Sequence, residues 1–370
     1  MTKNINYYNI DRIMNEDADI NWILGERSNG KSYQVKLKIM FDNYFESLNK
    51  NQDNPDRFML VRRRDDEITI TLCQAYFDDF KNYISKMTDN EYDHVKVSTN
   101  KIYLAKGYGK NEILGDYIGY RLALINEQDL AGTSYLDVKN IIFEEVISRS
   151  TYLGLKEPDK LMNLYSTIDR KRGIVKLWLL GNTISKVCPY FNAWGLDKYL
   201  YKMQPGDIVT YLTDSGYDDK VKIAIEYTGS SGTSSHTIGK SSAMMSDGSW
   251  QVDEQPKLNR SINDYKYLNF EIFFKYKTFT FKARFYKGND MFFFVSPAKK
   301  INKNAILFTD EILDRPLTFI NPYNITINNN YLNNVKNIIN KYFIASKIFY
   351  CNDGVGTDFK QVLPFKIKEI

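Results

Sequence analysis

Runs of consecutive apolar residues alternate, along the first half of the chain, with longer segments whose apolar positions recur at helical spacing. The short runs predict buried strands at residues 19–24, 57–61, 138–146 and 174–182. The helically spaced segments predict helices at residues 31–44, 67–85 and 161–170. Two further segments alternate between apolar and polar residues, as strands do: 95–105 and 117–125. Buried strands separated by helices are typical of a mainly parallel sheet, so we expect an α/β domain over residues 1–204.

The pattern changes in the second half of the chain. A segment rich in Gly and Ser predicts a connecting region, which we place at residues 205–264. Beyond it, two or three strands with a turn at Gly288-Asn289 are followed by one amphipathic helix, predicted over residues 330–350. These features predict a second, smaller α+β domain at residues 265–370.

The strand predicted at residues 19–24 runs into GERSNGKS, which fits the phosphate-loop pattern G-x-x-x-x-G-K-[ST]. Gly25 and Gly30 permit backbone angles that turn successive N–H groups toward phosphate oxygens. Lys31 is expected to reach the β- and γ-phosphates of ATP, and the Ser32 hydroxyl to bind Mg²⁺ at a helix start that favours anions. The other loop residues assigned to the nucleotide are Arg27, Ser28 and Asn29. The alternative, a polar turn between strand and helix, is disfavoured because few chance matches follow a buried strand and open a helix.

Two carboxylates end the strand predicted at residues 138–146. Glu144 is assigned to the Mg²⁺ shell, and Glu145 to the polarisation of an attacking water. Aspartate is usual at the first position, and the longer Glu144 side chain implies that its contact to the metal runs through a water. The alternative, a solvated acidic strand end, is disfavoured by the upstream phosphate loop. A strand-end glutamate beside the metal-side acid favours a hydrolysing motor ATPase over a small-molecule kinase.

Polar residues near the next predicted strand complete the candidate site. Asn182 and Thr183 follow that strand, where a side chain would sense the γ-phosphate or simply form a turn. The loop TIDRKRG precedes the strand, and Arg170 or Arg172 is expected to project onto the ATP of a neighbouring subunit. A solvated basic loop is the alternative there. Arg27 similarly contacts the γ-phosphate or faces solvent.

Composition narrows the class of protein. Three widely spaced cysteines and two histidines argue against a disulfide framework and a histidine-rich metal site, and they favour a reducing cytosol. The polar amino terminus is unlike a signal peptide, and no apolar run reaches the length of a membrane span. From residue 265 onward the chain contains 16 Lys and Arg residues and 8 Asp and Glu residues, whereas the preceding part carries a net charge of −3. The basic part is expected to meet phosphate backbones or to be a solvated, lysine-rich surface.

Five segments, in this order, carry a resemblance to a known family: ILGERSNGKS, FMLVRRRDD, VKNIIFEEVISRSTYLGLKEPDK, NLYSTIDRKRGIVKLWLLGNTIS and KIAIEYTGSSG. Together they resemble the DNA encapsidation ATPases of small protein-primed tailed phages of the phi-29 type, from Asn21 to about Gly232. The resemblance implies a phosphate-loop ATPase of the additional-strand, catalytic-glutamate type. It also implies a motor that docks on the portal of an empty capsid in the host cytoplasm and pumps double-stranded DNA inward.

By matching position, the resemblance assigns ATP and Mg²⁺ to Lys31 and Ser32, the metal-side acid to Glu144 and catalysis to Glu145, with the trans-acting arginine at Arg170 or Arg172. It further implies a homo-oligomeric ring of five subunits and, in some members, a packaging RNA. The resemblance implies that the carboxy-terminal domain is ribonuclease-H-like. FFKYKTFTFKARFY contains no acid, so we expect that domain to bind and not to cut. Two alternatives remain: a packaging ATPase with an active nuclease domain, and a nucleotide-binding module that does not pump.

Overall fold

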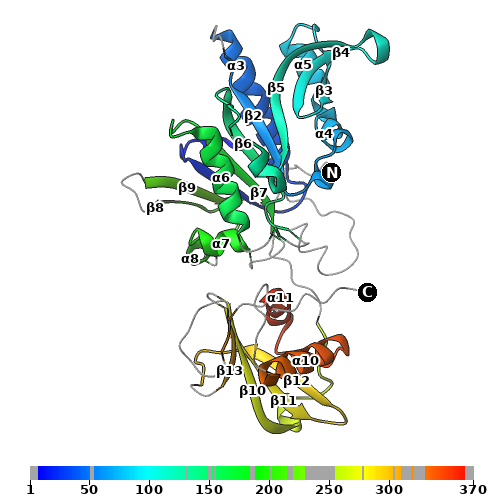
Figure 1. The fold of residues 1–370 in the computed structure, drawn as a ribbon, viewed down its shortest axis with the longest axis vertical. Coiled ribbons are helices and arrows are strands. Elements are labelled where there is room, and N and C mark those ends of the chain that lie inside the picture. Colours follow the sequence, from blue (N-terminus) through cyan, green and yellow to red (C-terminus); the bar gives the residue numbers. More distant parts are fainter. Residues whose placement is uncertain are drawn as a thin grey trace, which may run out of the picture. The chain divides into compact units, whose positions relative to one another are not determined.

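The structure is a computed structural model. It describes these residues: 7–50, 54–130, 132–148, 152–153, 156–183, 188–200, 202–214, 220–229, 255–276, 279–302, 305–309, 318–320 and 330–362. The described residues up to 229 belong to one compact unit, unit 1, and those from 255 to a second, unit 2 (Figure 1). Among the described helices, none is both long and apolar enough to cross a membrane.

Unit 1 is built on one large, mostly parallel sheet. Its strands in the described residues are β1 (Ile20–Gly25), β2 (Arg57–Arg62), β3 (His94–Ser98), β4 (Lys101–Lys106), β5 (Ile113–Ala123), β6 (Val138–Glu144), β7 (Lys176–Asn182), β8 (Ile208–Asp214) and β9 (Lys220–Tyr227). They lie in the order β3-β4-β5-β2-β6-β7-β1-β9-β8. The six strands from β5 to β9 in this order pair in parallel, and the flanking β3, β4 and β8 pair antiparallel. The prediction of an α/β domain with a mainly parallel sheet is confirmed.

Helices cover both faces of this sheet. The α-helices in the described residues of unit 1 are α1 (Asp11–Met14), α2 (Lys31–Val35), α3 (Asn43–Asn49), α4 (Ile70–Tyr76), α5 (Lys81–Met87), α6 (Glu157–Asp169), α7 (Pro189–Ala193) and α8 (Asp197–Leu200). Successive strand residues point to opposite faces: Trp22 packs with residues of α6 and α7, whereas Ile23 packs with residues of α2 to α5. Because both faces are buried, these strands are continuous apolar runs, which is why the sequence pattern identified them.

Several predicted elements differ in detail. The helix predicted at residues 31–44 extends to Asn49 and contains a π-helical segment, Lys36–Asp42, between α2 and α3. The helix predicted at 67–85 is wrong as one element, because α4 and α5 are separated by a 3₁₀ turn, Asp78–Phe80.

The connecting region predicted at residues 205–264 is corrected in its first part. Strands β8 and β9 lie inside it, and β9 pairs in parallel with β1, the strand that leads into the phosphate-loop motif. The sequence KIAIEY is a buried strand that the neighbouring Gly and Ser residues obscured. Residues 230–254 lie outside the described part of the chain.

Unit 2 has its own sheet and its own core. Its described strands are β10 (Lys266–Tyr276), β11 (Phe279–Lys287), β12 (Met291–Pro297), β13 (Ile306–Thr309), β14 (Thr318–Ile320) and β15 (Ile348–Tyr350), in the order β14-β13-β10-β11-β12-β15. The predicted turn at Gly288-Asn289 joins β11 to β12. The core packs the apolar side chains of this sheet, such as Phe274 and Phe281, against α10 (Asn330–Ile344) and α11 (Asp353–Val362).

One expectation for unit 2 is wrong. The helix predicted over residues 330–350 ends at Ile344, and its last part is the strand β15, which pairs in parallel with β12. The glycine-containing segment from Asp353 to Asp358 is the first part of α11. Tertiary packing of Val355 and Phe359 against the sheet outweighs the low helix propensity of the two glycines there.

Candidate nucleotide-binding site

A cavity of about 360 Å³ lies where the carboxyl ends of β1, β2, β6 and β7 meet the start of α2. Its lining residues are Arg27, Ser28, Asn29, Gly30, Lys31, Ser32, Tyr33, Arg62, Tyr76, Glu144, Glu145, Leu180, Gly181 and Asn182. In open α/β sheets, ligands bind outside the carboxyl ends of the strands, so this is the expected place for a site.

The backbone of the loop requires its two glycines. A Cβ atom on Gly25 would lie 1.8 Å from Thr228 Oγ1, so only glycine lets β1 pass this side chain. Gly30 precedes α2 with a φ of 98°, in the left-handed region that favours glycine. Asn29 lies between them and is buried. Its Nδ2 donates to Thr228 Oγ1 at 2.8 Å, and its Oδ1 accepts from the backbone N–H of Lys31 at 3.2 Å.

Lys31 lies at the centre of the loop and is nearly buried, with 6% of its surface exposed. Its Nζ donates to the backbone oxygen of Glu26, to Asn29 Oδ1 at 3.2 Å and to Asn182 Oδ1 at 3.4 Å. Burial lowers the pKa of Lys31 to about 8, and the carboxylates of Glu144 and Glu26 oppose this shift. Within the described part of the chain, the hydrogen-bond partners of the ammonium group are oxygen atoms of neutral groups, and an anion would stabilise it.

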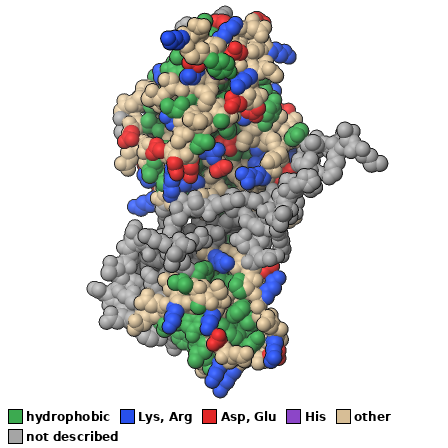
Figure 2. Space-filling view, turned by 90° about the vertical axis from the view of Figure 1, so that its right-hand side faces the viewer, with side chains coloured by type: hydrophobic (Ala, Val, Ile, Leu, Met, Phe, Trp, Pro, Cys, Tyr) green, Lys and Arg blue, Asp and Glu red, His purple; other side chains and the backbone are tan. Residues whose placement is uncertain are grey.

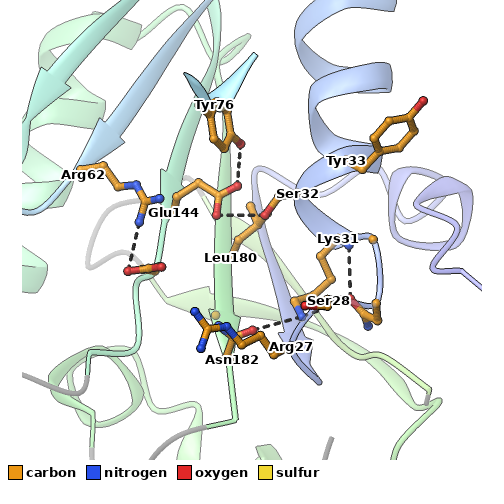
Figure 3. A pocket seen from close by; sticks show the side chains of 14 residues that line it. Arg27, Ser28, Lys31, Ser32, Tyr33, Arg62, Tyr76, Glu144, Leu180 and Asn182 are labelled. Carbon is orange, nitrogen blue, oxygen red and sulfur yellow. Dashed lines mark hydrogen bonds and ion pairs between the residues drawn. The ribbon is translucent and has the colours of Figure 1, made fainter. Parts of the chain in front are cut away.

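Glu144 ends β6 and faces Ser32 across the cavity. Ser32 Oγ donates to Glu144 Oε2 at 3.1 Å, and Tyr76 donates its hydroxyl proton to Glu144 Oε1 at 2.6 Å. Figure 3 shows Ser32 and Tyr76 reaching the two oxygens of one carboxylate. The carboxylate is buried, and these two donors satisfy it.

Glu145 follows β6 in a left-handed conformation, with a φ of 58°. Its side chain is 62% exposed, and its Oε2 forms an ion pair with Arg62 Nη1 at 3.1 Å. Arg63 stabilises this turn, because its guanidinium donates to the backbone oxygens of Glu145 at 3.3 Å and Val146 at 2.9 Å. Arg63 is buried and paired with Glu157 at 2.9 Å. The structure thus directs the two adjacent carboxylates differently, one toward Ser32 and one toward Arg62.

Other predicted residues lie around the same cavity. Arg27 and Ser28 line it, and Ser28 has a φ of 64°. Asn182 ends β7 and touches Lys31, as described. Thr183 is buried, and its backbone N–H donates to Gly25 O at 3.3 Å. Thr183 does not line the cavity.

The arginines of TIDRKRG are not part of this cavity. They follow α6 and precede β7, so they lie at the amino end of a strand whose carboxyl end carries Asn182. Because β7 runs parallel to β1, this loop lies at the sheet end opposite the phosphate loop of its own subunit. Arg170 is exposed and donates to Thr133 O at 2.7 Å.

Sequence reasoning missed three of the lining residues with functional groups: Tyr33, Arg62 and Tyr76. Arg62 had a signal, since it ends the strand β2 beside β6 and so reaches the same sheet edge. Tyr76 had none, because only the three-dimensional path of α4 brings it to Glu144.

The site fits a magnesium ion bound with a phosphorylated ligand. Mg²⁺ takes hard oxygen ligands, usually one or two from protein and the rest from phosphates and water. Ser32 Oγ and Glu144 Oε2 are two such atoms, 3.1 Å apart on the wall of the cavity.

The fold and the site define an α/β domain of the phosphate-loop kind. The chain belongs to the podovirus DNA encapsidation protein (Gp16) family, whose model matches residues 1–204. The resemblance inferred from the sequence motifs is thereby confirmed.

Individual relatives are distant. The chain is 27% identical over 193 residues to the DNA packaging protein of Bacillus phage phi29, a match covering 51% of this chain and 50% of that protein. It is 26% identical over 190 residues to the DNA packaging protein of Bacillus phage B103, with half of each chain covered. The chain thus spans about half the length of the curated relatives it matches.

Solved structures show a weak likeness over a longer stretch. The bacteriophage Phi-29 viral genome packaging motor assembly aligns over 96% of this chain and 99% of its own, with a TM-score of 0.48 and 20% identity. The N-terminal domain of the DNA packaging ATPase from bacteriophage phi29 aligns over 60% of this chain and 95% of its own, with a TM-score of 0.42 and 24% identity.

Proposed function

We propose that this chain is the ATP-hydrolysing subunit of a motor that drives double-stranded DNA through the portal into an empty phage capsid. The observation that carries the proposal is the convergence of Lys31, Ser32, Glu144 and Asn182 on one cavity, in a chain of the DNA encapsidation family. The relatives named DNA packaging protein support DNA as the substrate.

In this proposal the residues act as follows. Lys31 and the loop N–H groups hold the β- and γ-phosphates of ATP, and Ser32 and Glu144 hold Mg²⁺. Bound Mg²⁺ would neutralise charge that develops on the phosphates. Glu145 orients the attacking water and accepts its proton, and Asn182 contacts the γ-phosphate from the end of β7. Arg27 and Ser28 complete the loop around the phosphates.

The order of strands supports the additional-strand, catalytic-glutamate type. One strand, β7, lies between the loop strand β1 and the acid strand β6. The residue after the metal-side acid is a second glutamate, Glu145, whose side chain is exposed enough to reach water.

The proposal includes a ring, with five subunits as the resemblance implies and a packaging RNA as a further partner. The position of Arg170 and Arg172 supports subunit contact, because both lie at the sheet end opposite their own cavity. An arginine there would serve only the ATP of a neighbour.

Unit 2 is proposed to be a ribonuclease-H-like domain that binds nucleic acid or the capsid. Its strand order is β15-β12-β11-β10-β13-β14, and the part from β12 to β14, an antiparallel meander extended by the parallel strands β13 and β14, supports that assignment. On the face drawn in Figure 2, the charged side chains of unit 2 are mainly basic. Lys299 and Lys300 are exposed just beyond β12.

The function is tested by measuring ATP hydrolysis of the full chain alone, with DNA, and with DNA and empty capsids. We expect stimulation by DNA and capsids together and protection of the DNA from added nuclease. ATP binding without stimulated turnover would contradict a pumping function.

The role of unit 2 is tested by the salt dependence of DNA binding in the full-chain variant Lys299→Gln/Lys300→Gln. The slope of log affinity against log salt should shrink by about 0.9 for each phosphate that these lysines neutralise in the wild type. Lys86→Gln, an exposed lysine of α5 in unit 1, is the control and should leave the slope unchanged. An unchanged slope in the double variant would assign these lysines to a solvated surface.

A further inference from the structure

The metal-side carboxylate of this chain poses a geometric problem. Glu144 has one more rotatable bond than the aspartate usual at this position, so its side chain can adopt more conformers. It is nearly buried, and a buried carboxylate needs hydrogen-bond donors to remain charged. Something must therefore select the conformer in which one oxygen faces Ser32.

Tyr76, from the last turn of α4, makes that selection. Its hydroxyl lies 2.6 Å from Glu144 Oε1, whereas Ser32 Oγ lies 3.1 Å from the other oxygen (Figure 3). Burial, together with the Glu144 carboxylate, raises the pKa of Tyr76 well above its ordinary value. Because an ionised carboxylate can only accept, the hydroxyl of Tyr76 is the donor in this contact.

Tyr76 is in turn held by the helix that carries Ser32. Lys36 lies in the π-helical segment just after α2, and its side chain is only 7% exposed. Its Nζ donates to the backbone oxygen of Tyr76 at 2.7 Å and to Asp79 Oδ1 at 2.8 Å. The same ammonium lies 4.6 Å from the centre of the Tyr76 ring, close enough for a cation–π contact.

We propose that Tyr76 is a positioning residue that orients Glu144 for Mg²⁺, and that Lys36 fixes Tyr76 relative to Ser32. The inference rests on the proposed nucleotide site and adds a third element, α4, to its metal side. Partners that hydrogen-bond a metal's ligands typically contribute 10–100-fold to metal affinity or activity.

The test is equilibrium binding of a fluorescent ATP analogue to the full chain across a Mg²⁺ titration. In Tyr76→Phe, the Mg²⁺ concentration that gives half of the metal-dependent gain in affinity should rise about tenfold or more. Affinity without metal should stay within about twofold of wild type, since Lys31 and the loop are untouched. Tyr83→Phe is the matched control: its hydroxyl also donates to a carboxylate, that of Asp42, but it does not line the cavity.

A double-mutant cycle separates this role from general support of the fold. The carboxylate of Glu144→Asp is shorter and should no longer reach both Ser32 and Tyr76. Adding Tyr76→Phe to Glu144→Asp should then shift the Mg²⁺ midpoint less than about threefold. An equal shift in both backgrounds would overturn the proposal, because Tyr76 would then act without Glu144.

Other outcomes are equally decisive. An unchanged Mg²⁺ midpoint in Tyr76→Phe, or a parallel loss of metal-free affinity, overturns the positioning role. If Tyr76→Phe unfolds at a much lower temperature than Tyr83→Phe, Lys36→Met takes its place, and an unchanged midpoint there overturns the proposal. If the wild-type protein shows no Mg²⁺-dependent nucleotide binding, the proposed function fails. If the wild type shows such binding and the variants have the same Mg²⁺ midpoint, only the positioning role of Tyr76 fails.

Discussion

The two ends of the parallel sheet in unit 1 carry the same kinds of charged side chains but surround them differently. At the carboxyl ends, Lys31 and Glu144 line a cavity. At the amino ends, Arg57 is nearly buried but fully engaged: it donates to Tyr117 O at 2.8 Å and pairs with Asp116 at 3.0 Å. A buried charge therefore indicates a ligand site only where its neighbours leave space for the ligand.

The loop before β7 shows the same use of charge at the amino ends. Arg172 donates to the backbone oxygens of Asp169, Leu136 and Ile168 at 2.6–2.9 Å. Asp169 accepts from three successive backbone N–H groups after the loop. These hydrogen bonds complete the end of α6, so the guanidinium of Arg172 is already used within its own subunit, whereas Arg170 donates to one carbonyl group.

If Lys31 were dispensable for ATP binding, the carboxyl ends of the sheet would not differ from the amino ends in holding a nucleotide site. In Lys31→Ala the loop loses the ammonium group at its centre, and ATP affinity should fall at least about 100-fold, or roughly 3 kcal/mol. Isothermal titration would measure it. The control is Lys38→Ala, which removes a partly exposed lysine paired with Asp42 in the same helix and should bind ATP like wild type.

The pKa of Lys31 gives this prediction a pH dependence. Because burial lowers that pKa to about 8, the free protein loses the Lys31 charge as pH rises through 8, and ATP affinity should fall above that pH. Lys31→Arg would not titrate in this range, so its affinity should not follow the same pH curve. A flat wild-type profile from pH 7 to 9 would contradict the burial of this ammonium.

The trans-acting arginine is expected to affect turnover and not ATP binding. Arg170→Ala should leave ATP binding by the isolated subunit intact and reduce turnover of the assembled ring by about 10³–10⁵. Mixing Arg170→Ala with Glu145→Gln should restore part of the activity, since some interfaces then combine an intact arginine and an intact glutamate. Arg172→Ala should instead unfold more easily, by about 1–3 kcal/mol, because it removes the donors that satisfy three carbonyl groups.

The contrary result for these arginines is equally clear. If mixing restores nothing for either Arg170 or Arg172, neither acts across an interface. Recovery with Arg172→Ala alone would mean that its hydrogen bonds to the carbonyl groups open in the ring.

The substitution Glu145→Gln is expected to distinguish the role of Glu145 in hydrolysis from the role of Glu144 in Mg²⁺ binding. The amide cannot accept the proton of water, so turnover should fall about 10²–10⁴-fold while ATP and Mg²⁺ bind normally. Glu144→Gln should weaken Mg²⁺-dependent binding itself. If Glu145→Gln hydrolyses normally and Glu144→Gln binds but does not turn over, the two roles are reversed.

The smallest expected effect concerns Asp169, which lies before β7 at the amino ends of the parallel strands. Burial opposes ionisation of Asp169, but the N–H groups of Gly173, Val175 and Ile174 outweigh it and hold the pKa of Asp169 below its ordinary value. This stabilisation is present above the unfolded pKa of about 4 and is lost as pH falls through the lower folded value. Asp169→Asn should cost about 1–2 kcal/mol at pH 7 and less at pH 2–3, measured by urea unfolding. An equal cost at both values would mean that the charge plays no part.

How far the sequence predicted this fold depends on the surroundings of each strand. Strands β1, β2, β6 and β7 are buried on both faces, so their apolar runs were unambiguous. Strand β9 is equally buried toward its end, but the Gly and Ser residues that follow led to its assignment as connecting chain. The break between α4 and α5 was not predictable, since apolar spacing continues across it.

For the site, the sequence predicted what adjacent residues determine. The loop from Gly25 to Ser32 and the pair Glu144-Glu145 are contiguous, and the structure brings them to one cavity. Tyr76 could not be found, because its place depends on how α4 packs. The end of the sheet at which the loop of Arg170 lies follows from the parallel pairing of β7 with β1, which composition does not reveal.

The π-helical segment Lys36–Asp42 has a consequence for comparing this chain with its relatives. A π-helical turn holds about one more residue than an α-helical one, so it amounts to a one-residue insertion. Each α-helical residue turns the chain by about 100°. Deleting one residue here would rotate Tyr44 and Phe45 out of the core unless the segment became regular helix. Against a relative with a regular helix, a gap of one position is therefore expected between Lys36 and Asp42.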